Sequence, residues 1–161
     1  MNDDRVPLPG SELKLRVGER LAGDPPSSQT VDVTVLLRKR RDAPSEEELL
    51  SGRYHSGARP QAEQALAASP NDIAAVRAFA NQYGLKIIEE SAQTRRIHLE
   101  GTVQQIAAAF GVHLAYAQDS EGHQYLTYNG SISVPKSLAG IVVAVLGLDQ
   151  RPVARHRAPA Q

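Results

Sequence analysis

This chain of 161 residues carries 18 Lys plus Arg against 18 Asp plus Glu, so its formal net charge is zero. Zero net charge argues against nucleic acid as the main partner, because phosphate binding usually requires a basic excess; five Tyr, two Phe and no Trp also leave few rings for base stacking. The absence of Cys excludes disulfides, thiolate metal sites and a Cys nucleophile. No apolar run approaches membrane-spanning length, and the first ten residues lack a charged-then-apolar secretion signal.

The first part of the chain, residues 1–30, is rich in Pro and Gly and has little apolar periodicity, so we expect an extended N-terminal arm. A core is expected over residues 31–148. It opens with a strand at residues 31–40, VDVTVLLRKR, in which apolar positions alternate with a second set. That second set consists of Asp32, Thr34, Leu36 and Arg38.

Two later segments share one pattern of cap, helix, Gly and strand. In the first, Ser69 is a good N-cap, Pro70 suits the first helical turn, and Gly84 ends the helix before the strand LKIIEE. The second is residues 94–116, TRRIHLEGTVQQIAAAFGVHLAY. There an alternating strand precedes a capping box of Thr102 and Gln105, and a further strand is expected over residues 112–116.

A strand before each of these helices gives the order β-α-β-β-α-β. We therefore predict an α+β fold, a ferredoxin-like open sandwich with an antiparallel sheet and both helices on one face. HQYLTY at residues 123–128 predicts a strand that pairs back. An i, i+3, i+4 pattern after Pro135 predicts an extra C-terminal helix that Gly147 stops. Residues 149–161 are expected as an extended tail.

The expected outer face of this sheet is the informative surface. It would carry Asp32, Thr34, Leu36 and Arg38 on the first strand, Arg96, His98 and Glu100 on the third, and His113 and Ala115 on the fourth. Such a face is either solvated, as antiparallel sheets allow, or a docking surface for another protein. Composition leaves both alternatives open.

No catalytic motif stands out in the sequence. There is no HExxH spacing, GxSxG elbow or Gly-rich phosphate loop, so we expect no metal and no cofactor. His98 and Glu100 share a strand face and are a conceivable acid/base pair, although two polar residues on a wet or covered face explain the pattern more simply.

Three stretches resemble the activation (pro-) domain of the sedolisin, or serine-carboxyl, peptidases, and within them the kumamolisin-like branch. These are ASPNDIAAVRAFANQYGLKI, RRIHLEGTVQQIAAAFGVHL and, most specifically, VLGLDQRPVA at residues 145–154. The resemblance implies a ferredoxin-like propeptide, similar to subtilisin prodomains. Such a propeptide assists the folding of a secreted peptidase, inhibits its active site and is removed autocatalytically at acid pH.

The resemblance also implies what this chain lacks. The Ser-Glu-Asp triad and the calcium site of the family belong to a separate peptidase domain, and the Gly-Thr-Ser nucleophile motif is absent here. The chain is therefore expected to be no enzyme itself and to bind no calcium. Its expected partner is the cognate peptidase, without nucleic acid or membrane, and the capped helices predict a folded monomer.

By the same resemblance, the outer sheet face would dock on surface helices of the peptidase, and the tail would lie extended in the substrate cleft. The expected cleft occupants are Asp149, Gln150, Arg151, Pro152, Val153, Ala154, Arg155, His156 and Arg157.

Acid would weaken such a complex in either of two ways. Asp32, Glu100 or Asp149 would take up a proton if paired there, or His98 or His113 would do so if buried there as neutral rings.

One alternative from another class stays open. A free-standing ferredoxin-like module that binds a small molecule or a protein would use the same open sheet. An RNA-binding version of it is disfavoured by the zero net charge and by the lack of paired aromatic residues on the outer face.

Overall fold

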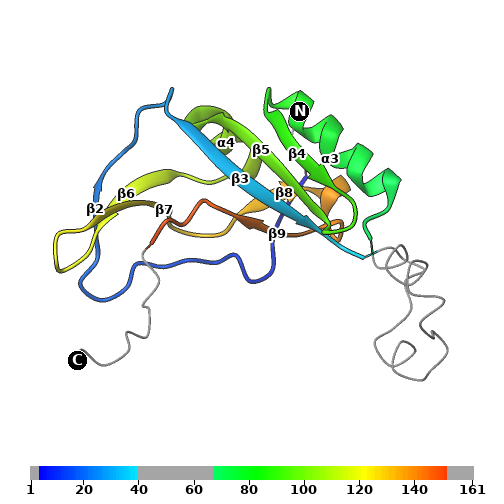
Figure 1. The fold of residues 1–161 in the computed structure, drawn as a ribbon. Helices are drawn as coiled ribbons and strands as arrows, with labels where there is room; N and C mark the ends of the chain where they lie inside the picture. Colours follow the sequence, from blue (N-terminus) through cyan, green and yellow to red (C-terminus); the bar gives the residue numbers. More distant parts are fainter. Residues whose placement is uncertain (1–3, 40–66, 152–161) are drawn as a thin grey trace, which may run out of the picture.

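The computed structural model describes residues 4–39 and 67–151 of the protein. Its main sheet has four antiparallel strands in the order β4-β5-β3-β9. These strands are β3 (Thr30–Leu37), β4 (Lys86–Ser91), β5 (Arg96–Thr102) and β9 (Val142–Leu146). β3 is therefore central, with β5 on one side and β9 on the other (Figure 1).

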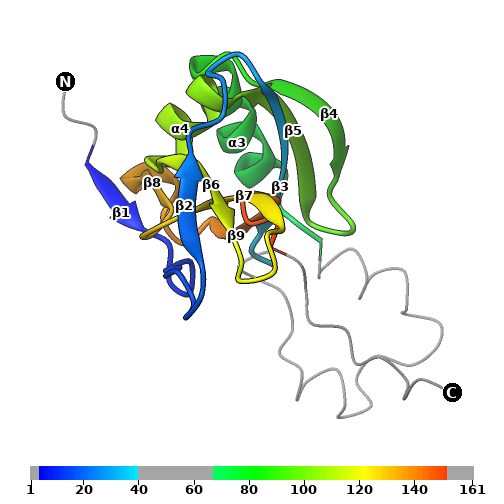
Figure 2. The same ribbon diagram turned by 90° about the vertical axis from the view of Figure 1, so that its left-hand side faces the viewer.

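Two helices cover one face of this sheet. They are α3 (Pro70–Gln82) and α4 (Val103–Phe110), and Figure 2 shows both on the same side of β3, β4 and β5. The chain order β3-α3-β4-β5-α4-β9 is the βαββαβ arrangement of a ferredoxin-like fold. The predicted fold class is thus confirmed.

Both predicted helix caps are present. The Ser69 hydroxyl accepts from the Asp72 backbone N–H at 3.1 Å, at the start of α3. At the start of α4, Thr102 Oγ1 accepts from Gln105 N at 3.2 Å, and Gln105 Oε1 accepts from Thr102 N at 2.9 Å. Both helices therefore begin directly after the predicted cap residues.

The fourth strand of the sheet is not the one predicted. Residues 112–116 were expected to supply it, but β6 (Leu114–Gln118) lies between β2 (Arg20–Gly23) and β7 (Gln124–Tyr128) in a second sheet. The predicted strand at 123–128 is present as β7 and pairs back on β6. A third pairing joins β1 (Arg5–Pro7) to β8 (Ser133–Pro135).

The predicted C-terminal helix is wrong. Only the three-residue 3₁₀ turn η2 (Lys136–Leu138) forms; the chain then bends at Gly140, where φ is 81°, and continues as β9. This backbone conformation ends any helix begun at Pro135. The run VVAVL is rich in β-branched residues, and pairing with β3 gives its backbone the hydrogen bonds a helix would have supplied.

The N-terminal segment is part of the domain rather than a separate arm. Leu8 is 4% exposed and belongs to the core, which also contains Phe110 and Leu126. The Arg5 guanidinium donates to Ala108 O at 3.1 Å and to Ala109 O at 2.9 Å, which satisfies carbonyl groups at the end of α4.

We predict that Leu8→Ala lowers the free energy of unfolding by about 2–4 kcal/mol, because it removes buried methyl groups and leaves a cavity. Urea denaturation followed by circular dichroism measures the change. Val17→Ala is the matched control, since Val17 is fully exposed, and it should shift stability by less than about 0.5 kcal/mol. A loss of stability from Leu8→Ala as small as that from Val17→Ala would show that Leu8 does not contribute to the core.

Candidate functional site

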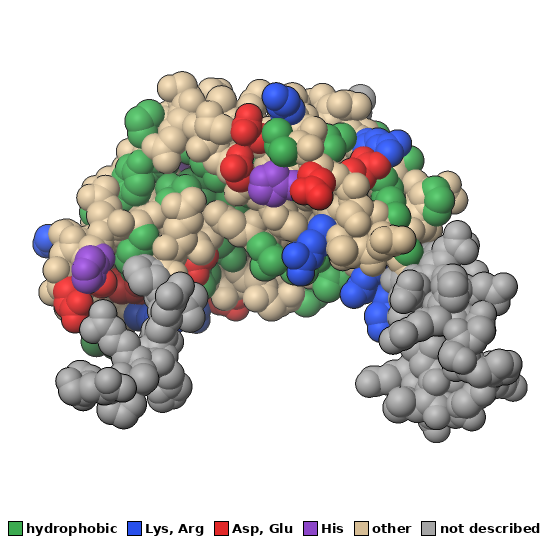
Figure 3. All heavy atoms as spheres, in the orientation of Figure 1, with side chains coloured by type: hydrophobic (Ala, Val, Ile, Leu, Met, Phe, Trp, Pro, Cys, Tyr) green, Lys and Arg blue, Asp and Glu red, His purple; other side chains and the backbone are tan. Residues whose placement is uncertain are grey.

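The outer face of the four-stranded sheet is the broadest candidate site. Neither helix lies on it, and it faces the viewer in Figures 1 and 3. Acidic, basic, histidine and hydrophobic side chains are mixed there (Figure 3). Six of the nine predicted docking residues share this face, because they alternate with the buried positions of β3 and β5. They are Asp32, Thr34, Leu36, Arg96, His98 and Glu100.

His98 is the centre of the polar part of this face. Its Nδ1 lies 3.2 Å from Thr34 Oγ1, and its Nε2 lies 3.8 Å from Asp32 Oδ2. Glu89 of β4 is its cross-strand partner. The ring is thus held between a hydroxyl and a carboxylate on β3 rather than by Glu100, and this geometry favours a surface polar cluster over an acid/base pair.

The part of the face along β9 is apolar. Leu146 lies opposite Thr34 in register, and Ala144 lies opposite Leu36, so these side chains share the outer side. Leu146 is 49% exposed, and Val143, next to a register shift, is 53% exposed. The outer face therefore divides into an apolar strip along β9 and a charged half along β4 and β5.

The edge strand β4 is protected by charge and by an irregularity. A register shift lies between Ile87 and Glu89, and the Arg77 side chain on α3 pairs with the Glu90 carboxylate. Hydrogen bonding from Arg77 lowers the pKa of Glu90. Bulges and charged side chains of this kind discourage pairing with another chain at this edge.

Three predicted docking residues lie elsewhere. Arg38 donates to both Asp72 carboxylate oxygens, at 2.9 and 3.2 Å, and so ties the end of β3 to the start of α3. The same contact raises the pKa of Arg38. His113 pairs with Asp24 at 3.0 Å just before β6, and Ala115 on β6 is buried. The expected place of His113 and Ala115 on the outer face was wrong because it rested on β6 being the fourth strand.

The tail does not begin at Asp149. Asp149 Oδ1 accepts from Thr127 Oγ1 at 2.9 Å, and Gln150 N donates to Leu126 O at 2.8 Å. The Arg151 side chain is 7% exposed, and its Nε lies 3.0 Å from Glu19 Oε2. These three residues therefore belong to the folded body, and the other predicted cleft occupants, residues 152–157, lie outside the described residues.

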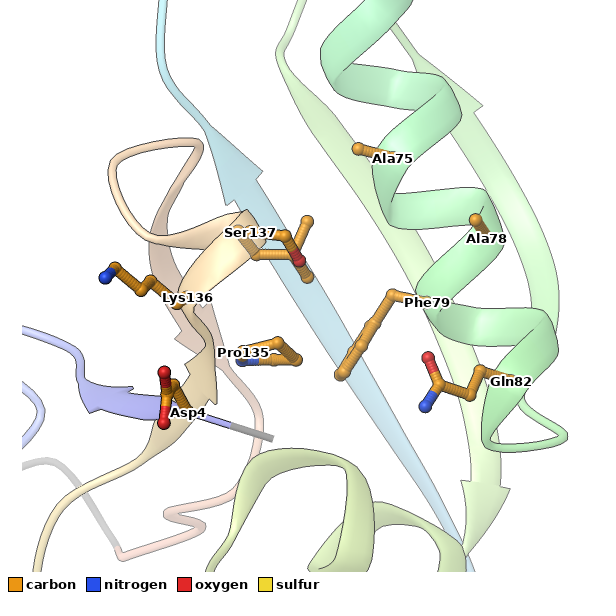
Figure 4. A pocket seen from close by; sticks show the side chains of 9 residues that line it. Asp4, Ala75, Ala78, Phe79, Gln82, Pro135, Lys136 and Ser137 are labelled. Carbon is orange, nitrogen blue, oxygen red and sulfur yellow. The ribbon is translucent and has the colours of Figure 1, made fainter. Parts of the chain in front are cut away.

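A groove of about 410 Å³ lies on the helix side, away from the outer face. Its walls are α3 and the β8–η2 segment, and Figure 4 shows Phe79 pointing from α3 toward Pro135 while Lys136 points away from the cavity. The volume suits a small ligand, and Asp4, Gln82 and Ser137 are polar residues of its lining.

Within residues 4–39 and 67–151, no cluster of three or more His, Asp or Glu side chains is arranged to hold a metal ion. No helix in these ranges has both the length and the apolar character that crossing a membrane requires.

Comparison with known proteins identifies the family to which this domain belongs. Residues 18–151 match the family model of the pro-kumamolisin activation domain. The chain belongs to this family. It is 35% identical over 133 residues to kumamolisin from Bacillus sp. (strain MN-32), an alignment that covers 79% of this chain and 24% of kumamolisin. The chain thus spans about a quarter of that relative's length and is an activation domain rather than a catalytic one.

The VLGLD stretch, on which the resemblance to this family rested most, has a structural explanation. Leu146 ends the apolar strip, and Leu148 is 1% exposed in the core. Between them, Gly147 has a φ of 105°, and a Cβ there would lie 2.7 Å from the Asp32 carbonyl oxygen. A side chain at this position would therefore push β9 away from β3.

Sequence reasoning missed five residues of the outer face. Lys86, Glu89 and Ser91 lie opposite the predicted β5 residues, and Ala144 and Leu146 lie opposite β3. The first three could have been predicted by pairing the strand LKIIEE with β5. The last two required VVAVL to be recognised as a strand, and its β-branched composition between two Gly residues was the available signal.

We predict that Glu90→Gln destabilises the domain near neutral pH and that the difference from the native sequence shrinks in acid. Arg77 holds the pKa of Glu90 below its usual value, so this carboxylate contributes stability above about pH 4.5 and loses it as pH falls through the lowered pKa. Thermal unfolding at several pH values between 3 and 7 measures this. Glu12→Gln, at a more exposed pair with Lys14, is the control. A difference that stays constant with pH would contradict the assignment.

Proposed function

We propose that this domain is the inhibitory and folding-assisting propeptide of a kumamolisin-like serine-carboxyl peptidase. The observation that carries the proposal is the uncovered outer sheet face, with an apolar strip of Leu36, Ala144 and Leu146 beside a charged half. Protein interfaces commonly combine an apolar core with a polar rim, and this face offers both. Membership in the activation-domain family supplies the class of partner.

The segment after Arg151 is the proposed occupant of the substrate cleft. An extended chain binds such a cleft through main-chain hydrogen bonds, while side-chain pockets set the register. Residues 152–157, PVARHR, carry two Arg and one His. The peptidase is proposed to be a secreted enzyme with a Ser-Glu-Asp triad and a calcium site in its own domain, and to remove the propeptide autocatalytically.

Acid release is the proposed trigger for removal. Asp32 and Glu100 remain the candidate carboxylates of the docking face, and His98 the candidate histidine. Protonation makes the His98 ring, which lies between Thr34 and Asp32, a cation. Burying that cation against the peptidase costs free energy that pairing with Asp32, whose Oδ2 lies 3.8 Å from Nε2, offsets only in part.

The groove between α3 and η2 favours a second candidate, a free-standing module that binds a small molecule. This alternative predicts no inhibition of any kumamolisin-like peptidase by the folded chain. It also predicts that filling the groove with Ala78→Phe abolishes ligand binding.

We predict that the purified chain inhibits a mature kumamolisin-like peptidase near neutral pH, and that Leu146→Asp raises the inhibition constant by at least about tenfold, since it places a charge in the apolar strip. Val17→Asp is the matched control, because it adds the same charge at an exposed site in the N-terminal segment. Steady-state inhibition assays measure both variants. A folded chain that does not inhibit would favour the small-molecule module.

We predict that the inhibition constant rises as pH falls and that His98→Gln removes part of this rise. His113→Gln is the control, since His113 pairs with Asp24 outside the outer face. Inhibition measured from pH 7 to 4 compares the three proteins. If His98→Gln leaves the profile unchanged, the histidine has no part in release; if His113→Gln changes it equally, the effect is not specific to this face.

A further inference from the structure

The most unusual contact outside the docking face is the ion pair between Glu19 and Arg151. Its Nε to Oε2 distance is 3.0 Å, and the two side chains are only 6% and 7% exposed. Charged side chains are rarely this buried, because removing both from water costs free energy that mutual attraction must offset. The Arg151 Nε–H makes no hydrogen bond within the described residues, so the pair acts through charge rather than through a directed hydrogen bond.

Both partners are held by further contacts. The second Glu19 oxygen accepts from the Arg16 backbone N–H, and Glu19 N donates to Arg16 O at 3.0 Å, so a tight turn presents the carboxylate. The Arg151 guanidinium carbon lies 6.0 Å from the centroid of the Tyr125 ring, and Nη2 reaches Lys14 O at 3.4 Å. The Arg151 side chain is thus enclosed by β7 and the N-terminal segment.

The backbone leading to Arg151 is fixed in the same way. Gln150 N donates to Leu126 O, and Asp149 Oδ1 bridges Thr127 Oγ1 and Arg151 N, the latter at 3.2 Å. The family match begins at residue 18 and ends at residue 151, so this ion pair joins the two ends of the matched region.

From these contacts we infer that Glu19 and Arg151 are positioning residues, which fix the place of the residue that immediately precedes the proposed cleft segment. The pair holds Arg151 in the folded body, so the segment available to a peptidase cleft begins at Pro152. The positioning role rests on the proposed function, because it concerns how the docked domain presents this segment to the peptidase. A fixed position of Arg151 sets how many residues are available to span the distance from the docked sheet to the cleft. If Arg151 were not held by Glu19, the same segment could enter the cleft in many registers, and binding would carry an additional entropic cost.

The test uses the full chain with Glu19→Gln, Arg151→Gln and the double substitution. Hydrogen exchange followed by mass spectrometry compares the amides of residues 149–151 with those of β5. We expect each single variant to speed exchange at 149–151 by at least about tenfold while β5 stays protected, because an unpaired buried charge opens this region locally. The double variant should speed exchange at 149–151 by less than the product of the two single-variant factors, because the two residues interact directly.

Inhibition of a mature kumamolisin-like peptidase by the same proteins tests the positioning role. We expect the inhibition constants of both single variants to rise at least about tenfold. Leu138→Ala, a core substitution in η2, controls for lost stability, and Glu12→Gln controls for loss of an exposed ion pair. In both controls, the ratio of exchange rates between residues 149–151 and β5 should stay near that of the native chain. Their inhibition constants should also stay near the native value.

Each outcome decides a separate claim. Unchanged exchange at 149–151 in the single variants overturns the fixed position of Arg151, whatever the inhibition assay gives. Faster exchange with an unchanged inhibition constant overturns the positioning role, and an equal loss of inhibition in Leu138→Ala assigns the effect to stability instead. If the native chain itself does not inhibit, the proposed function fails and the positioning role fails with it, while the exchange result still decides whether the ion pair fixes the position of Arg151.

Discussion

The double pairing of β3 is the constraint on which the rest of this domain depends. Val33 and Val35 are each 1% exposed, and the strand that carries them is bonded to β5 on one side and β9 on the other. As a result β3 and β4 run parallel on either side of β5, and β5 and β9 run parallel on either side of β3. Right-handed crossovers between parallel strands then place α3 and α4 on the same face. The opposite face is left open as a result, and its composition follows from the outward residues of four strands.

The two ends of the described chain are fixed by charged groups rather than by apolar packing alone. Arg5 donates to the last carbonyls of α4, and Arg151 is paired with Glu19 beneath the N-terminal segment. Arg38 and Asp72 similarly join β3 to α3 on either side of residues 40–66. The Arg5 and Arg38 side chains each donate to two acceptors in a defined geometry, which fixes positions more strictly than apolar contact does. Arg151 contributes an ion pair with Glu19 and a hydrogen bond to Lys14 O.

Sequence reasoning succeeded where the signal was local and failed where tertiary pairing decided. Ser69 and the Thr102–Gln105 box marked both helix starts, and alternation marked β3 and β5. The run VVAVL satisfies a helical spacing and a strand composition equally well, and only the vacant edge of β3 selects the strand. That single error displaced His113 and Ala115 onto the docking face and removed Leu146 from it. The pairing of Glu19 with Arg151 was missed for a different reason, because no short-range pattern connects residues 19 and 151.

The late position of β9 in the sequence determines when the central strand β3 can be paired on both sides during synthesis of the chain. Translation delivers β3 early and β9 near the end of the described chain, so one edge of the central strand stays unpaired while everything between them is synthesised. Residues 31–37 have a high β propensity, so until β9 is available their unpaired edge can pair with a strand of another chain. The four-stranded sheet can therefore be completed only after residues 142–146 are available, and a chain that lacks them would leave one edge of β3 open to pairing with another chain.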